Sequence, residues 1–183
     1  MGCTGKAAVW FFWFLNTVLS IGFAILAAVT LENVRELYNE LDDLQDASSE
    51  ARQFSLVGLM AGTVLGAILV IGYSVFTFLF LFCKWMSRGQ MMGAGYSIMQ
   101  TASIYTSAFL LLDALTLHAS DKTVDISFNS DEENAYTATY LLAYVLVGTY
   151  IFMFFVFWWC KKAFTREAQL ASEALSAKNS AQA

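Results

Sequence analysis

The stretch FLFLFCKWMSRGQMMGAGYS, residues 78–97, joins two long apolar runs through a short polar interruption. This interruption carries Lys84 and Arg88 and no acidic residue. An apolar run of about 20 residues can cross the ~30 Å hydrocarbon core of a bilayer as a helix. Short loops rich in Lys and Arg stay preferentially on the cytosolic side. The stretch therefore predicts a tight cytosolic turn between two membrane-spanning helices.

The rest of the chain repeats this pattern. Of its 183 residues, 58% are hydrophobic and only 14% are charged, whereas soluble domains contain about 25% charged residues. Four apolar runs lie at residues 7–31, 56–83, 91–117 and 137–160. The first run is too long and too aromatic for a cleaved signal peptide. The sequence predicts an all-α fold: one four-transmembrane-helix bundle over residues 1–160, followed by a cytosolic helical tail over 161–183.

Charge and tryptophan positions predict the orientation. In a four-span arrangement, seven basic residues and two acids lie on the side of the 84–88 turn, and three basic residues and twelve acids lie on the other. All five tryptophans lie at the basic side, at the depth where indole rings favour the headgroups. We therefore expect a multi-pass protein of the plasma membrane or an endomembrane, with cytosolic termini and extracytoplasmic acidic loops.

The first span is expected to continue outward as an amphipathic helix. Apolar residues after residue 31 follow helical spacing, and the segment up to residue 45 contains neither Gly nor Pro. The helix should end near DASSE, residues 46–50, where Asp and Ser can cap the next helix.

Three cysteines, Cys3, Cys83 and Cys160, all fall at the predicted cytosolic boundary. The outer loops contain no cysteine, which argues against tetraspanins, claudins and connexins, because these depend on outer-loop disulfides. Juxtamembrane cysteines are typical sites of S-palmitoylation. The alternative is that a small apolar thiol simply suits these positions.

The second span contains a tandem small-residue series, Gly58, Gly62 and Gly66, on one helix face. Small residues let helix backbones approach closely in lipid. The series predicts a packing interface, either within the bundle or with a helix of a partner.

The third span is the most polar. Its residues Tyr96, Gln100, Ser103, Thr106, Ser107 and Asp113 share a broad face. Together with Asn16, Thr17 and Ser20 of the first span, they could form an interhelical hydrogen-bond network or a pathway for an ion. Asp113, four residues before the expected helix end at Leu117, is the one acidic residue within the spans, and such a residue is a functional-site candidate. The alternative is a structural role, in which the carboxyl reaches the membrane interface or pairs with His118 or a basic residue of an outer loop. The predicted intramembrane polar network consists of Asn16, Gln100, Ser103, Ser107 and Asp113.

No catalytic, cofactor or metal site is predicted. The chain has one histidine, His118, without a cysteine nearby for zinc. This boundary histidine also cannot complete a convincing Ser–His–Asp grouping. We expect a protein that is not an enzyme and that has no nucleic-acid partner.

In its layout of four spans, a tight second-to-third turn and two outer loops, the chain resembles MARVEL-domain proteins, which organise membranes and accompany vesicles or junctions. It is similar in the same way to the small tetraspan auxiliary subunits of channels. The resemblance implies an accessory or organising subunit of a larger assembly, embedded in the lipid bilayer and bound to another integral membrane protein or to copies of itself. The alternative is a small channel or transporter that uses the polar face of the third span.

Overall fold

The computed structural model describes residues 3–42, 47–82, 91–123 and 130–180, and each of these ranges is one helix. Helix α1 is Cys3–Asp42, α2 is Ala47–Phe82, α3 is Met91–Thr123 and α4 is Ser130–Ser180. The described residues contain no strand. The predicted all-α class with four helices is therefore confirmed.

Each helix contains a segment long and apolar enough to cross a membrane: Val9–Glu36, Leu56–Phe80, Gly95–Ser120 and Glu133–Lys162. All four overlap the predicted runs. The segment in α3 has the lowest mean hydropathy, 1.3, against 2.1 to 2.2 in the others, because it contains most of the polar face. The chain thus has the architecture of a tetraspan membrane protein.

All four helices extend past their apolar runs at one or both ends, and the extensions of α1 and α3 bear on the predictions above. Helix α1 continues unbroken to Asp42, as the helical spacing of that segment predicts. Helix α3 continues to Thr123, so the prediction that it ends at Leu117 is wrong. The following residues, HASDKT, include neither Gly nor Pro, and nothing among them terminates a helix. Asp113 therefore lies well inside α3, roughly 15 Å from its end at 1.5 Å per residue.

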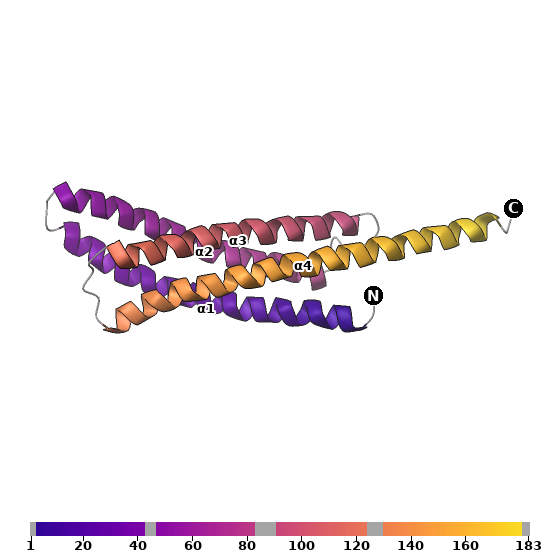
Figure 1. Cartoon of the computed structure of the whole chain (residues 1–183), viewed down its shortest axis with the longest axis horizontal. Helices are drawn as coiled ribbons and strands as arrows, with labels where there is room; N and C mark the ends of the chain where they lie inside the picture. Colours follow the sequence, from indigo (N-terminus) through magenta and orange to yellow (C-terminus); the bar gives the residue numbers. More distant parts are fainter. Residues whose placement is uncertain (1–2, 43–46, 83–90, 124–129, 181–183) are drawn as a thin grey trace.

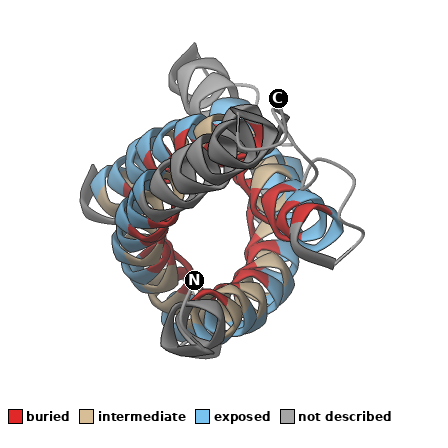
Figure 2. Cartoon of the chain, turned by 90° about the vertical axis from the view of Figure 1, so that its right-hand side faces the viewer, coloured by how far each residue is buried: buried red, intermediate tan, exposed pale blue. Residues whose placement is uncertain are grey.

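The helices form an up-down-up-down ring (Figures 1 and 2). Helix α1 packs against α2 and α4, and α3 packs against the same two helices. Within the described residues, no Cα atom of α1 comes within 8 Å of one in α3, and the same holds for α2 and α4. Side chains therefore fill the centre, and Figure 2 shows the buried residues on the inward sides of the ring.

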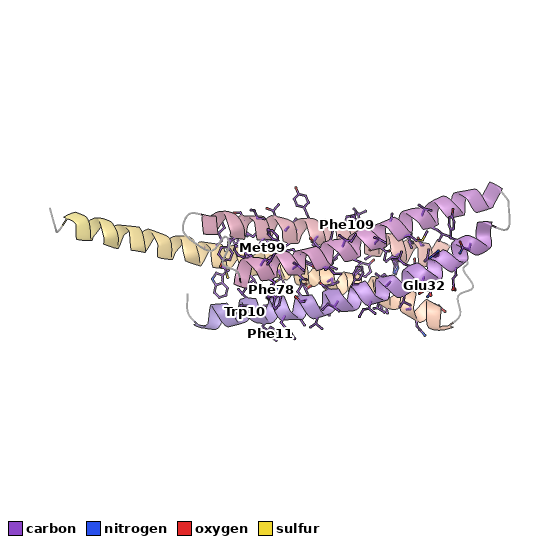
Figure 3. The ribbon with its side chains drawn as sticks, turned by 180° about the vertical axis from the view of Figure 1, so that it is seen from behind. Trp10, Phe11, Glu32, Phe78, Met99 and Phe109 are labelled. Carbon is purple, nitrogen blue, oxygen red and sulfur yellow. The ribbon has the colours of Figure 1, made fainter. Side chains whose placement is uncertain are left out.

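The core extends along the whole bundle. Its largest fully buried side chains include Phe23, Met99, Leu110, Tyr150 and Phe157. A second, smaller cluster lies toward the end at which Glu32 is labelled in Figure 3, and it consists of Val34, Leu56, Leu59, Leu117, Tyr136 and Tyr140.

The outward surface of the ring is apolar. Phe11, Phe14, Ile25 and Leu112 are each more than 60% exposed. Contiguous apolar surface on this scale is rare on soluble monomers. In a membrane it faces lipid tails, with which it is compatible.

Helix α4 is longer than the others. Figure 1 shows its C-terminal part projecting beyond the other three helices. The predicted boundary between membrane domain and tail, at residue 160, falls inside this continuous helix.

Candidate functional site

The most unusual group in the interior is the carboxyl of Asp113. The residue is 6% exposed, and its Oδ2 atom is buried without a hydrogen-bond partner. Burying an unpaired charge costs several kcal/mol, so a lone acid in this position is a functional candidate.

The carboxyl of Asp113 lies against two glycines of α2. A Cβ atom built on Gly62 would lie 3.0 Å from Asp113 Oδ1, and one built on Gly66 would lie 3.1 Å from Oδ2. Residues four apart lie on the same helix face, so both glycines present bare backbone to one carboxyl group. The tandem glycines and the intramembrane acid, two separate features of the sequence, thus meet in one place.

The other atoms near the Cβ position at Gly66 are apolar. Phe23 Cε1 of α1 and Leu110 Cδ2 of α3 lie 3.7 and 3.8 Å from the Cβ position at Gly66. The third member of the glycine series differs, because a Cβ built on Gly58 would meet nothing within 4 Å. Gly58 is exposed on the outside of the ring.

His118 does not complete this site. Its ring lies edge-on to Tyr140 and Tyr144 of α4, with centroids 5.1 and 6.5 Å apart. Its Nδ1 atom is also buried without a hydrogen-bond partner. An ion pair between His118 and Asp113 is one of the options that the sequence leaves open for this acid, and the structure does not contain it.

A second polar centre crosses the ring. The Tyr73 hydroxyl of α2 lies 2.6 Å from Ser103 Oγ of α3, which donates to the backbone oxygen of Met99 at 2.8 Å. Ser103 thus accepts the proton of Tyr73. The Tyr73 ring also meets the Tyr150 ring of α4 edge-on at 4.8 Å, so these two tyrosines join helices whose backbones do not touch.

Three further interhelical hydrogen bonds join α1 to α4. Thr149 Oγ1 donates to Asn16 Oδ1 at 3.0 Å, and the Tyr150 hydroxyl lies 3.4 Å from Ser20 Oγ. Farther along the pair, the hydroxyls of Thr30 and Thr139 are 2.8 Å apart.

All five residues of the predicted polar network are at most 8% exposed: Asn16, Gln100, Ser103, Ser107 and Asp113. None of the hydrogen bonds described above joins two of them. The partners of Asn16 and Ser103 are Thr149 and Tyr73, which the polar-face pattern of the sequence missed. A tyrosine within a span is a sequence feature that could have indicated such a partner, because a buried phenol usually finds a hydrogen-bond partner.

The three cysteines differ in their surroundings. Cys160 is a free thiol, 3% exposed, within the main core cluster. Cys3 lies in the first turn of α1, where only the backbone is described, and Cys83 lies outside the described residues.

Comparison with known proteins identifies no relative: no protein family, curated protein or solved structure matches this chain. Among the described residues, no three His, Cys, Asp or Glu side chains come together in a group that could bind a metal ion. The geometry therefore supports an architecture: a tetraspan bundle with a buried carboxyl that lies against two glycines of α2.

Proposed function

We propose that the chain is a non-enzymatic tetraspan protein that acts as an accessory or organising subunit of a larger membrane assembly. The observation that carries this proposal is the projection of α4 beyond the bundle (Figure 1). Most helical stability in proteins comes from packing against neighbours. A helix that leaves its own bundle therefore favours a binding partner.

The sequence of the projecting part fits this role. Residues 163–180, AFTREAQLASEALSAKNS, are rich in alanine, a strong helix former. Leu170 and Leu175 are the two leucines of this segment, and they could contact a partner. MARVEL-type organisers and channel auxiliary subunits both belong to the functional class that we propose.

The test is native extraction in mild detergent, with particle mass and quantitative mass spectrometry of the full chain and of a chain that ends at Lys162. We expect a stoichiometric integral membrane protein with the full chain, and its loss on truncation. Leu170→Ala combined with Leu175→Ala should weaken the association, whereas Gln169→Ala, the matched control, should retain it. A full chain that elutes without another protein would refute the accessory role.

We propose as the second candidate a small channel or transporter. The buried, unpartnered Oδ2 of Asp113 favours it, because intramembrane acids often lie on ion or proton pathways. The test is flux in liposomes, with Asp113→Asn and Gln100→Leu expected to alter the rate. The lipid-facing Ile104→Leu serves as the control. Liposomes that remain silent to protons and alkali cations would exclude this candidate.

We propose that both termini are cytosolic, because the basic residues gather on their side and the acids on the other. Glycosylation acceptor sites inserted at residues 43–46 and 124–129 should be modified, and one at the C-terminus should not. The opposite pattern would invert the orientation.

We also propose that acylation occurs at Cys3 or Cys83. The Cys160 thiol is covered by the core, which disfavours access by an acyltransferase. Acyl exchange on Cys3→Ser and Cys83→Ser variants tests this. A signal that only Cys160→Ala abolishes would contradict it.

A further inference from the structure

The lipid-facing surface of the bundle carries one polar patch far from the ends of the spans. Among the described residues, the polar side chains exposed on the outside lie within five residues of a span's end, with two exceptions, Thr101 and Tyr105 of α3. Tyr105 is 71% exposed, more than any other large hydrophobic or aromatic residue described. Neither hydroxyl has a hydrogen-bond partner in the described part of the chain.

The depth of Tyr105 makes this exposure costly. It lies ten residues into the span that begins at Gly95, roughly 15 Å deep at 1.5 Å per residue, which is half the ~30 Å hydrocarbon core. Figure 3 labels Met99 and Phe109, which bracket Tyr105 in α3, and both lie within the length of the bundle. A hydroxyl transferred into an apolar medium without a hydrogen bond is strongly disfavoured.

A third exposed hydroxyl group on α3 forms a hydrogen bond within its own helix. Thr116, also exposed on α3, donates to the backbone oxygen of Leu112 at 2.9 Å. A tyrosine hydroxyl is too far from its own backbone for that solution. A partner for the Tyr105 hydroxyl at this depth would therefore belong to another molecule.

We propose that the outer face of α3 formed by Thr101, Tyr105 and Ala108, the Tyr105 face, is the interface of a homodimer with its two-fold axis along the membrane normal. This inference does not rest on the accessory role. All copies insert in the same orientation, so a two-fold axis of this kind places equal depths opposite each other. The same patch on both copies then forms the interface.

The chemistry of the Tyr105 face is self-complementary. Side chains on a helix lean toward its N-terminus, which brings the Tyr105 hydroxyl toward the depth of Thr101, one turn earlier. A hydroxyl both donates and accepts. Tyr105 of each copy can therefore donate to Thr101 of the other, which gives two symmetric hydrogen bonds. Ala108, one turn later on the same face, leaves room for close approach of the two helices.

The first test measures energy transfer between donor- and acceptor-labelled full chains in liposomes at increasing lipid dilution. We expect reversible self-association of the wild type. Tyr105→Phe and Thr101→Val should each weaken it about tenfold, the factor expected for two interhelical hydrogen bonds of the strength measured in membranes. Val145→Ala, on the exposed face of α4, is the control and should leave it unchanged.

The second test locates the contact. In a chain with its native cysteines replaced, Ala108→Cys should form a disulfide-linked dimer on mild oxidation, and Val64→Cys on the outside of α2 should not. A photoreactive phenylalanine at position 105 should give an adduct of twice the 20.3 kDa chain mass. Three results would each overturn the proposal: no self-association at any dilution, association unchanged by Tyr105→Phe, or an adduct at 105 with a different protein.

Discussion

Gly62 and Gly66 have no side chain, and a Cβ atom on either would lie within 3.0 to 3.1 Å of a carboxyl oxygen of Asp113, closer than ordinary van der Waals contact. At the residue scale, α2 and α3 approach closely here because neither glycine carries a side chain. A larger residue at either position of α2 would require the carboxyl of Asp113 to shift by a few tenths of an ångström.

We predict that Gly62→Ala and Gly66→Ala each destabilise the bundle by about 1–3 kcal/mol, the usual cost of overpacking. Gly58→Ala should be close to neutral, because a Cβ there meets nothing within 4 Å. The measurement is the free energy of unfolding in mixed micelles. Combining either substitution with Asp113→Ala should recover at least about 1 kcal/mol, since contacting residues couple. Strict additivity would show that the glycines and the acid do not touch.

The two central tyrosines allow a second prediction. Tyr73→Phe should cost roughly 1 kcal/mol, because it removes a short hydrogen bond to Ser103 and leaves the ring contact with Tyr150 in place. Tyr150→Phe should cost less, because its contacts with Ser20 Oγ and the Val70 oxygen are 3.4 and 3.5 Å, the limit for a hydrogen bond. The same unfolding assay compares them. A larger loss for Tyr150→Phe would reverse this ranking of the two sites.

At the element scale, α2 and α3 make one very close contact, between the C-terminal end of α2 and the N-terminal part of α3. A Cβ on Gly95 of α3 would overlap the ring of Phe80 of α2. That ring also meets Tyr96 edge-on, with centroids 5.2 Å apart. The absence of a side chain at residue 95 therefore permits the approach of α3, and this approach helps to place Asp113 opposite Gly62.

We predict that Gly95→Ala lowers the free energy of unfolding by about 1–3 kcal/mol, because the Phe80 ring has to move out of a packed core. Gly72→Ala is the control, since a Cβ at this exposed position meets nothing within 4 Å. Shortening the ring by Phe80→Leu in the Gly95→Ala background should restore part of the loss. If the double variant is no more stable than Gly95→Ala, the ring is not the obstacle.

At the scale of the whole molecule, the ring is closed by contact between α1 and α4, the first and the last helix. Thr30 and Thr139 lie in these two helices, with hydroxyls 2.8 Å apart. Helices α1 and α3, in contrast, lie on a diagonal, and their described Cα atoms stay more than 8 Å apart. A disulfide needs Cα atoms within about 7 Å.

Thr30→Cys paired with Thr139→Cys should therefore form an intramolecular disulfide under mild oxidation. Ser20→Cys paired with Ser103→Cys, on the diagonal, should not. The readout is the mobility shift of the monomer and its reversal by reductant. Cross-linking of the diagonal pair, or failure of the α1–α4 pair, would contradict the order of helices around the ring.

Much of the fold follows from the sequence alone. The length of each apolar run specifies the number of spans, because only a helix satisfies its backbone in lipid over that length. The inward position of the third-span polar face follows from helical periodicity. The same periodicity places Tyr105 on the opposite, outward face. The absence of a hydrogen-bond partner for its hydroxyl among the described residues, in contrast, is visible only in the structure.

The tertiary structure determined which polar groups of different helices contact each other. The contact of Asp113 with Gly62 and Gly66 depends on the axial position of α3 relative to α2. The hydrogen bond from Tyr73 to Ser103 depends on the same axial position. No periodicity within a single helix encodes that position. It results from contacts such as Gly95 with Phe80 and from the closure of the ring by α1 and α4. The sequence by itself determined four apolar helices with their polar groups on one side. The packing of those helices determined which polar groups meet, because side chains from different helices come into contact only when the bundle assembles.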